Sequence, residues 1–360
     1  MNCSGIQFNG RSISLVELPK TEPATPAEAA TLAVIGAWLG GAGTFPLRSS
    51  GSTGAPKDIR LTRAQLLASA GRSVAALGLV PGDATLVCLS VGTAGGLLGV
   101  VRALAFDLPL TVIDPVSDPL AVVGQASRFA TVSLVPMQMQ AVLAHGAAGV
   151  AWLDRMRAVL IGGAAVPPAL ETALQAVTAP VYHTYGMTET ASHVALRRLN
   201  GPTRTDYFTA LPGIELRLGP NGALDIRADV THHEWLRTTD RAELLGGGRF
   251  RWLGRLDDVL NSGGVKVDAA RVQRAVEETL AALDLAPYDV CVMGVPDPRL
   301  GEQVMAWLGG PPLTDAQLAE LRAALTSRLT RYEVPKAFRV LPELPRLPGG
   351  KVDRTALRHP

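Results

Sequence analysis

The stretch between residues 85 and 184 alternates short apolar runs, rich in β-branched residues, with longer stretches of helical character. The runs predict strands at 85–89, 110–113, 131–135, 158–161 and 181–184, and the stretches between them predict helices at 95–105, 137–144 and 168–177. Parallel strands need crossover connections, so this repetition predicts a parallel sheet with helices on its faces. Ligands bind such sheets outside the carboxyl ends of the strands.

The pattern changes after residue 201. Short, turn-bounded runs predict antiparallel strands at 213–218, 222–227 and 250–252, with Pro220-Asn221-Gly222 as a hairpin signal. A polar joint follows at 254–258. Beyond it, a small α+β domain is predicted from helices at 269–283 and 314–329 and strands at 289–295 and 303–308, with Thr314 as an N-cap.

The predicted fold class is therefore α/β. A large N-terminal domain at 1–254 combines a mostly parallel, helix-covered sheet with antiparallel strands, and a small α+β domain occupies 259–360.

A loop rich in glycine and hydroxyl residues precedes the alternating region, formed by Ser49, Ser50, Gly51, Ser52, Thr53, Gly54, Ala55, Pro56 and Lys57. Successive backbone N–H groups in such a loop can form an anion-binding concavity that suits a polyphosphate. It is not a P-loop, because Pro56 stands where the second glycine should be and Asp58 follows the lysine. On composition alone, a flexible surface loop is an equal alternative.

Three further motifs follow in order: Tyr185-Gly186-Met187-Thr188-Glu189-Thr190; Thr239-Asp240 with Gly254-Arg255-Leu256-Asp257-Asp258 through Gly263-Gly264-Val265-Lys266; and Pro348-Gly349-Gly350-Lys351-Val352-Asp353-Arg354. Together with the loop at 49–57 they resemble the adenylate-forming superfamily, which includes acyl-CoA synthetases, peptide-synthetase adenylation domains and luciferases. Four motifs in the expected order over residues 48–354 make a chance match very improbable.

The resemblance implies ATP-dependent activation of a carboxylic acid. Residues 49–57 would wrap the β- and γ-phosphates, the Thr188 hydroxyl would contact the α-phosphate, and Glu189 would hold Mg²⁺, a hard ion that prefers carboxylate and phosphate oxygens. Tyr185 and Gly186 belong to the same nucleotide motif. Outside that motif, Glu189 would read as an exposed loop carboxylate.

The remaining nucleotide contacts are implied in the same way. Asp240 would accept hydrogen bonds from both ribose hydroxyls, and Arg255 would support the ribose from the joint. Gly163 and Ala164, after a strand, would let the backbone lie against adenine. A surface ion pair for Asp240 or Arg255, and a simple chain turn for Gly163, are the alternatives.

By the same resemblance, Lys351 is the catalytic lysine. A compact charge on a long stem can reach between the substrate carboxylate and the phosphate. Asp257 marks a hinge at 255–258, about which a mobile small domain rotates between an adenylating and a thiol-accepting pose. Gly263, Gly264 and Lys266 would then face the thiol channel of CoA, although Lys266 reads equally well as a surface lysine.

The residues after the nucleotide motif, from Ser192 to Gly201, are similar to those of o-succinylbenzoate–CoA ligases of menaquinone biosynthesis. The succinyl carboxylate would be activated, and the aromatic carboxylate would need a cationic or multi-donor partner. Ser192, His193 and Arg197 are the candidates for this acid pocket. A structural histidine and a surface-paired arginine are the alternatives. The segment before Arg48 is shorter than in typical acyl-CoA synthetases, which questions the completeness of the sheet.

Composition narrows the class of partner. The formal net charge of +2 gives no broad basic field for nucleic acid, and no apolar run is clean enough for membrane insertion. Cys3, Cys88 and Cys291 lack metal-site spacing and fit a reduced compartment, so a cytoplasmic enzyme is expected. The expected partners are ATP, CoA and a small carboxylic acid, with a homo-oligomer left open. Another aryl or short-chain acid, a carrier-protein thiol and a non-catalytic nucleotide-binding homologue remain as alternatives.

Overall fold

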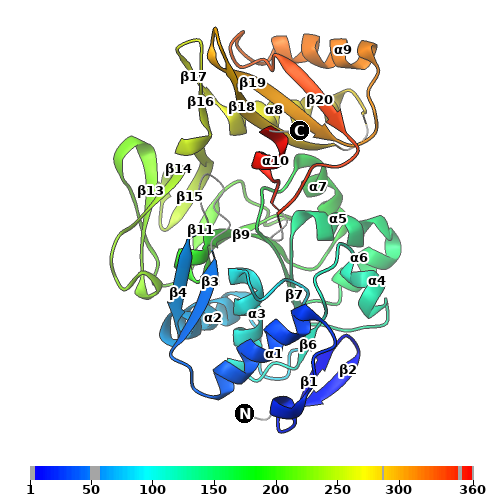
Figure 1. Ribbon diagram of the computed structural model, residues 1–360, viewed down its shortest axis with the longest axis vertical. Coiled ribbons are helices and arrows are strands. Elements are labelled where there is room, and N and C mark those ends of the chain that lie inside the picture. Colours follow the sequence, from blue (N-terminus) through cyan, green and yellow to red (C-terminus); the bar gives the residue numbers. More distant parts are fainter. Residues whose placement is uncertain (1–4, 49–56, 286–287, 348–350, 359–360) are drawn as a thin grey trace.

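The computed structural model describes residues 5–48, 57–285, 288–347 and 351–358. Within them, a 13-stranded sheet carries the large N-terminal domain and a separate 5-stranded sheet carries the smaller C-terminal one. The predicted α/β class is confirmed. In Figure 1 the small domain, yellow to red, lies at one end of the molecule, and β1 and β2 (Gly5–Phe8 and Arg11–Ser14) lie at the other.

All of the strands predicted from the alternating region form, and they are parallel neighbours in the central sheet: β5 (Thr85–Val87), β6 (Leu110–Val112), β7 (Thr131–Leu134), β8 (Ala158–Ile161) and β9 (Val181–Met187). β9 is longer than predicted. Its antiparallel partner β10 (Ser192–Arg198) pairs as far as Met187, so Tyr185, Gly186 and Met187 belong to the strand instead of following it.

The other half of the sheet is antiparallel, as the turn-bounded runs predict. Its further strands are β11 (Phe208–Ala210), β12 (Glu215–Leu218), β13 (Ala223–Arg227), β14 (Leu236–Gly246) and β15 (Arg249–Arg255). Pro220-Asn221-Gly222 does connect an antiparallel pair, β12 and β13. β14 was not predicted.

Helices cover both faces of the sheet, because side chains of each buried strand alternate between them. Val87 packs in the apolar cluster of one face and its neighbour Leu86 in that of the other. The first face is covered by α1 (Pro26–Leu39), α2 (Arg63–Leu77) and α3 (Ala94–Ala105). The second is covered by α4 (Pro119–Val123), α5 (Pro136–Ala144), α6 (Ala147–Leu153) and α7 (Pro168–Ala173), followed by the 3-10 turn η2 (Leu174–Ala176).

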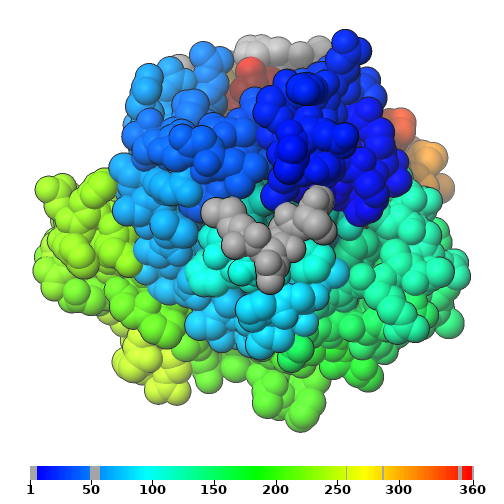
Figure 2. Space-filling model, turned by 90° about the horizontal axis from the view of Figure 1, so that it is seen from below, coloured from blue at the N-terminus to red at the C-terminus, as the bar shows by residue number. Residues whose placement is uncertain are grey.

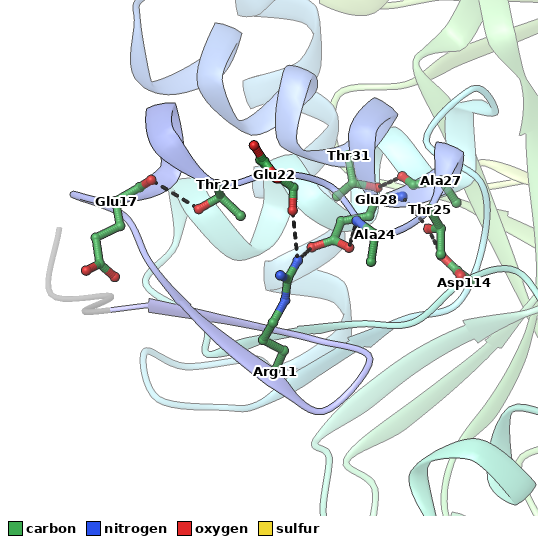
Figure 3. Close-up of polar contacts among 10 residues, drawn as sticks. All are labelled: Arg11, Glu17, Thr21, Glu22, Ala24, Thr25, Ala27, Glu28, Thr31 and Asp114. Atoms are coloured by element: carbon green, nitrogen blue, oxygen red, sulfur yellow. Dashed lines mark hydrogen bonds and ion pairs between the residues drawn. The ribbon is translucent and has the colours of Figure 1, made fainter.

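The first described residues extend the sheet beyond β6. β1 pairs in parallel with β6, and β2 pairs antiparallel with β1, so the sheet is continuous where the sequence questioned it. Arg11 of β2 forms an ion pair with Glu28, a buried side chain of α1 that also accepts from the backbone N–H of Ala24 at 2.8 Å (Figure 3). Seen from the end opposite the small domain, the dark blue residues lie against the lighter blue and cyan ones that follow them in the chain (Figure 2).

The predicted phosphate loop falls between two strands. β3 (Thr44–Arg48) and β4 (Asp58–Thr62) form an antiparallel pair, in which Arg48 Nε donates to Asp58 Oδ1 at 3.0 Å. Residues 49–56 lie outside the described part of the chain, and Lys57 is exposed immediately before β4. The strand pair thus fixes both ends of the segment in which the loop was predicted.

The small domain has the predicted α+β composition. Its elements are β16 (Val259–Ser262), β17 (Val265–Asp268), α8 (Ala269–Ala282), β18 (Asp289–Asp297), β19 (Gly301–Gly309), α9 (Asp315–Thr326), β20 (Ala337–Leu341) and α10 (Arg354–Arg358). Thr314 is the N-cap of α9, and Gln317 completes a capping box. Among the described residues of both domains, no helix is long and apolar enough to cross a membrane.

Candidate active site

Asp240 of β14 accepts side-chain hydrogen bonds from residues of two other strands of the large sheet. Tyr185 of β9 donates its hydroxyl to Asp240 Oδ2 at 2.8 Å, and Trp252 of β15 donates Nε1 to Asp240 Oδ1 at 3.1 Å. Burial, followed by the charge of Asp240, raises the pKa of Tyr185 well above its usual value, so the phenol is a permanent donor here. A carboxylate oxygen accepts more than one hydrogen bond, so Asp240 keeps acceptor capacity for ribose hydroxyls.

Arg255 lies directly opposite Asp240 in the ladder between β14 and β15. The two residues predicted to bind the ribose are therefore neighbours, although 15 positions separate them in the chain. This geometry is consistent with both residues contacting one ribose, and the ribose contacts themselves stay a prediction.

Glycines allow close backbone approach where adenine contacts were predicted. A Cβ on Gly162 would lie 2.3 Å from Thr184 Oγ1, and Gly163 has a φ of +84°, which favours glycine. Ala164 follows, and its carbonyl oxygen lies 3.2 Å from His183 Nε2. Residues 162–164 thus leave the carboxyl end of β8 beside β9, where ligands of parallel sheets bind.

A short 3-10 turn, η3 (Thr188–Thr190), carries Thr188 and Glu189. The two residues after it have positive φ without being glycine: +50° at Ala191 and +87° at Ser192. Such conformations cost on the order of 1–3 kcal/mol each and persist where surrounding contacts enforce them. Ser69 of α2 provides one such contact, donating to the Ala191 carbonyl at 2.7 Å.

Lys351 reaches the same place from the small domain. Lys351 is exposed as a residue, yet desolvation of its ammonium, followed by the charge of Arg255, lowers the pKa of Lys351, while Asp240 and Glu189 oppose this shift. The structure therefore brings four predicted residues together from widely separated positions. Two carboxylates, one lysine and one arginine in this arrangement can bind a nucleotide and balance charge that develops on its phosphates.

The predicted hinge residue lies between the two domains, and the predicted CoA-side residues lie on a hairpin of the small domain. Asp257 lies in the 3-10 turn η6 (Leu256–Asp258), between the last strand of the large sheet and the first of the small one. Gly263 and Gly264 form the turn between β16 and β17, with φ values of +61° and +80°, and Lys266 is exposed on β17. Figure 1 shows this hairpin pointing away from the large domain.

His193 is the acid-pocket candidate whose electrostatic neighbours are two arginines. It pairs with Gly186 across β9 and β10, and its Nε2 is buried with no hydrogen-bond partner among the described residues. Burial first, then the charges of Arg102 and Arg72, lower the pKa of His193 to about 3, so the ring is neutral.

The two arginines were not predicted as site residues. Arg102 of α3 is 1% exposed; its Nη1 donates to Ser73 Oγ at 2.9 Å, and its Nε finds no partner among the described residues. Arg72 of α2 donates to Asp229 Oδ1 at 2.6 Å. Its Nε and Nη2 are buried and also lack a hydrogen-bond partner among the described residues. Burial lowers the pKa of Arg102 to about 10, so it stays charged at neutral pH. The sequence signal was an arginine inside the otherwise apolar run 94–105.

Arg197 and Ser192 do not join this cationic cluster of Arg72, Arg102 and His193. Arg197 forms an ion pair with Glu171 of α7, and its charge lowers the pKa of the buried His183. This ion pair agrees with the alternative given for Arg197 from the sequence, that of an arginine paired on the protein rather than with the acid. Ser192 contributes through its carbonyl oxygen, which accepts from Thr190 Oγ1 at 2.7 Å.

Two family models match the chain. The model of the AMP-binding enzyme matches residues 48–221, and that of the AMP-binding enzyme C-terminal domain matches residues 265–351. The two ranges cover the nucleotide motif and the lysine segment.

Individual proteins similar to this chain include CoA ligases and an acyl-CoA synthetase-like protein. The crystal structure of an acyl-CoA synthetase (AMP-forming)/AMP-acid ligase II-like protein from Dyadobacter fermentans DSM 18053 is 37% identical, with a TM-score of 0.61, over 94% of this chain and 96% of that one. A probable 2-succinylbenzoate–CoA ligase of Mycobacterium tuberculosis is 32% identical over 86% of this chain and 82% of its own length. A methyl-dioxo-octahydroindenyl-propanoyl:CoA ligase of Rhodococcus jostii (strain RHA1) is 30% identical over 76% of this chain, which spans about half (53%) of that ligase.

Proposed function

The chain belongs to the AMP-binding enzymes, and we propose that it is an AMP-forming acid–CoA ligase for an acid with a second carboxylate. The first candidate is o-succinylbenzoate, whose succinyl carboxylate would be adenylated and then transferred to CoA. On this proposal ATP and CoA are co-substrates and the enzyme is cytoplasmic.

The observation that carries this proposal is the cationic cluster beside the nucleotide motif. Arg72 pairs with Asp229 and Arg102 donates to Ser73, yet both arginines and the neutral His193 retain buried nitrogens without partners among the described residues. Unpaired buried charge is costly, so such a cluster suits an anionic ligand group that completes it. Guanidinium groups match carboxylates in geometry. His193 pairs with Gly186 of the nucleotide motif, so the cluster lies beside the motif proposed to bind the nucleotide.

The adenylation step follows from the group around Lys351. Asp240 and Arg255 would hold the ribose, residues 49–57 the β- and γ-phosphates, and Thr188 the α-phosphate. Lys351 would bridge the acid's carboxylate and the α-phosphate as the carboxylate attacks and pyrophosphate leaves. Glu189 fits a magnesium site, since Mg²⁺ usually takes one or two carboxylates along with phosphate oxygens, and the ion would neutralise phosphate charge.

Thioester formation would need a different pose. In the present one, the charges of Asp240, Arg255 and Glu189 act on Lys351, and the hairpin with Gly263, Gly264 and Lys266 points away from the large domain. Rotation about 255–258 would exchange the two, withdrawing Lys351 and bringing that hairpin towards the thiol.

One alternative retains the chemistry and changes the acid. The indenyl-propanoyl ligase is about as similar to this chain as the succinylbenzoate ligase is, so a larger monocarboxylic acid is the second candidate. The cationic cluster favours the dicarboxylic acid over it.

The test is pyrophosphate release with ATP, Mg²⁺ and o-succinylbenzoate, with and without CoA, with the product mass measured. The matched control acid is 4-oxo-4-phenylbutanoate, which has the same succinyl arm and lacks the ring carboxylate. We expect a CoA thioester of the dicarboxylic acid and at least a tenfold lower kcat/KM for the control. Equal use of both acids would contradict the role of the cluster, and pyrophosphate release without a thioester would point to a carrier-protein thiol.

A further inference from the structure

Lys351 is carried by a short antiparallel hairpin near the end of the chain. Leu347 N–H donates to the Lys351 carbonyl at 2.8 Å, Arg346 and Val352 form a β-bridge, and Asp353 N–H donates to the Pro345 carbonyl at 2.7 Å. These bonds hold residues 351–353 to the incoming strand. The direction in which Lys351 points therefore depends on how this hairpin is attached to the rest of the protein.

Two apolar side chains attach it to the small domain. Leu344 before the hairpin and Leu357 after it are each 2% exposed and pack in one cluster with Cys291 and Met293 of β18 and with Trp307 of β19. This contact holds both ends of the hairpin and leaves the position of Lys351 to the polar residues between them.

One arginine precedes Lys351 in the chain and another comes after it, and each forms an ion pair with a carboxylate. Arg346 pairs with Asp289, the first residue of β18. Arg354 pairs with Asp258, the last residue of η6, which belongs to the segment between the domains. Arg354 stands three positions after Lys351, so its partner sets where this part of the hairpin lies.

The pair between a half-buried Arg354 and a buried Asp258 is shielded on its carboxylate side. The Asp258 side chain is 9% exposed, and Arg354 also donates to Cys291. A buried ion pair adds little net stability compared with apolar packing, but removal of one partner is costly and the geometry is tightly defined. Such a pair suits a positioning role.

We propose that Arg354 is a positioning residue for Lys351: its ion pair with Asp258 fixes the lysine hairpin to the start of the small domain. The inference rests on the proposed function, because Lys351 is taken as the adenylating lysine. Asp258 then moves with the small domain, since its ion pair with Arg354 holds it there. The hinge predicted at 255–258 is thereby narrowed to residues 255–257, and the hairpin and its lysine turn as one body.

The tether can be tested without any catalysis. The lysines of the chain are Lys20, Lys57, Lys266, Lys336 and Lys351, so ¹³C-methylation of the lysines gives few NMR signals, and the signal that Lys351→Arg removes is that of Lys351. In the wild type we expect this signal to titrate at lower pH than the others, because desolvation and the charge of Arg255 lower the pKa of Lys351. Arg354→Met and the isosteric Asp258→Asn should each move its titration up towards that of the other lysines.

Arg358→Met is the matched control, since it removes a guanidinium from the same helix α10 at an exposed position. It should leave the Lys351 titration unchanged. A Lys351 titration that is the same in wild type, Arg354→Met and Asp258→Asn would overturn the proposal. A shift in Arg354→Met but not in Asp258→Asn would also overturn it, because Arg354 would then act through another partner.

Half-reactions separate positioning from general damage. Arg354→Met should slow acyl-adenylate formation about 10- to 100-fold, while a supplied acyl-adenylate is still consumed with CoA at the wild-type rate. Arg354→Lys, which retains the charge, should recover part of the loss. Equal loss of both half-reactions would contradict a positioning role. If the wild type adenylates no acid, the proposed function fails and the NMR titration still decides whether the tether exists.

Discussion

Arg102→Met should make the free protein more stable and the enzyme less selective. Arg102 is fully buried in α3, and within the described structure its one hydrogen bond is to Ser73, at 2.9 Å. Burial lowers the pKa of Arg102 from 12.5 to about 10, which corresponds to about 3 kcal/mol against holding the charge in the folded state. The lost bond to Ser73 returns about 1 kcal/mol. The expected net gain in the free energy of unfolding is about 2 kcal/mol.

The sign follows from proton linkage. The folded state binds the Arg102 proton less tightly than the unfolded chain does, so the penalty is fully present below pH 10 and disappears as the pH rises through that value. Methionine, unbranched and neutral, fills a similar volume without the charge. Replacing buried charge by apolar groups stabilises other proteins by a similar amount.

Guanidinium chloride unfolding at pH 7, with and without o-succinylbenzoate, is the assay. Without ligand, the midpoint of Arg102→Met should exceed that of the wild type, and with ligand the wild type alone should gain stability. Arg60→Met, at an exposed position of β4, is the control and should change the free energy of unfolding by less than about 0.5 kcal/mol. A lower midpoint for Arg102→Met without ligand would refute the reasoning, because Arg102 would then be a structural support.

Three further outcomes are expected. Lys351→Ala should reduce acyl-adenylate formation at least about 100-fold while a supplied acyl-adenylate still reacts with CoA, and equal loss of both steps would reject that role. Gly186→Ala should cost about 2–3 kcal/mol in thermal unfolding, because its Cβ would lie 2.1 Å from the Ser192 carbonyl oxygen. Burial raises the pKa of Glu277 to about 7, in a site that Asp289, Arg274 and Glu278 also face. The small domain should therefore lose stability as the pH rises through 7, by on the order of 2 kcal/mol between pH 5 and 8. Glu277→Gln should remove this loss.

The sequence was informative where one local rule decides the structure. Apolar runs and the helices between them predicted the parallel half of the sheet, and Thr314 predicted a helix start, because period and capping act over a few residues. Two helices, α1 and α2, were not predicted although each has a cap: Thr25 accepts from Glu28 N–H, and Thr62 forms a capping box with Gln65.

The rest depends on contacts between distant segments. The cationic cluster joins α2, α3 and β10, and in sequence Arg72 is an ordinary charged residue of an amphipathic helix. β9 runs on through Tyr185 because β10 pairs with it, which no pattern within 181–187 reveals. The meeting of Lys351 with Asp240 depends on the pose of the small domain. Motif resemblance predicted that group, and periodicity could not have done so.

The pairing of β1 with β6 bears on how the chain is made. Phe8 is opposite Val112, so 104 residues must be synthesised before the two can meet. At roughly 5–20 residues per second, ribosomal synthesis leaves β1 without this neighbour for about 5–20 s. During that time β1 can pair with β2, whose register from Gly5 opposite Ser14 is local. β2 thus covers one edge of β1 early, and the opposite edge stays unpaired until β6 leaves the ribosome.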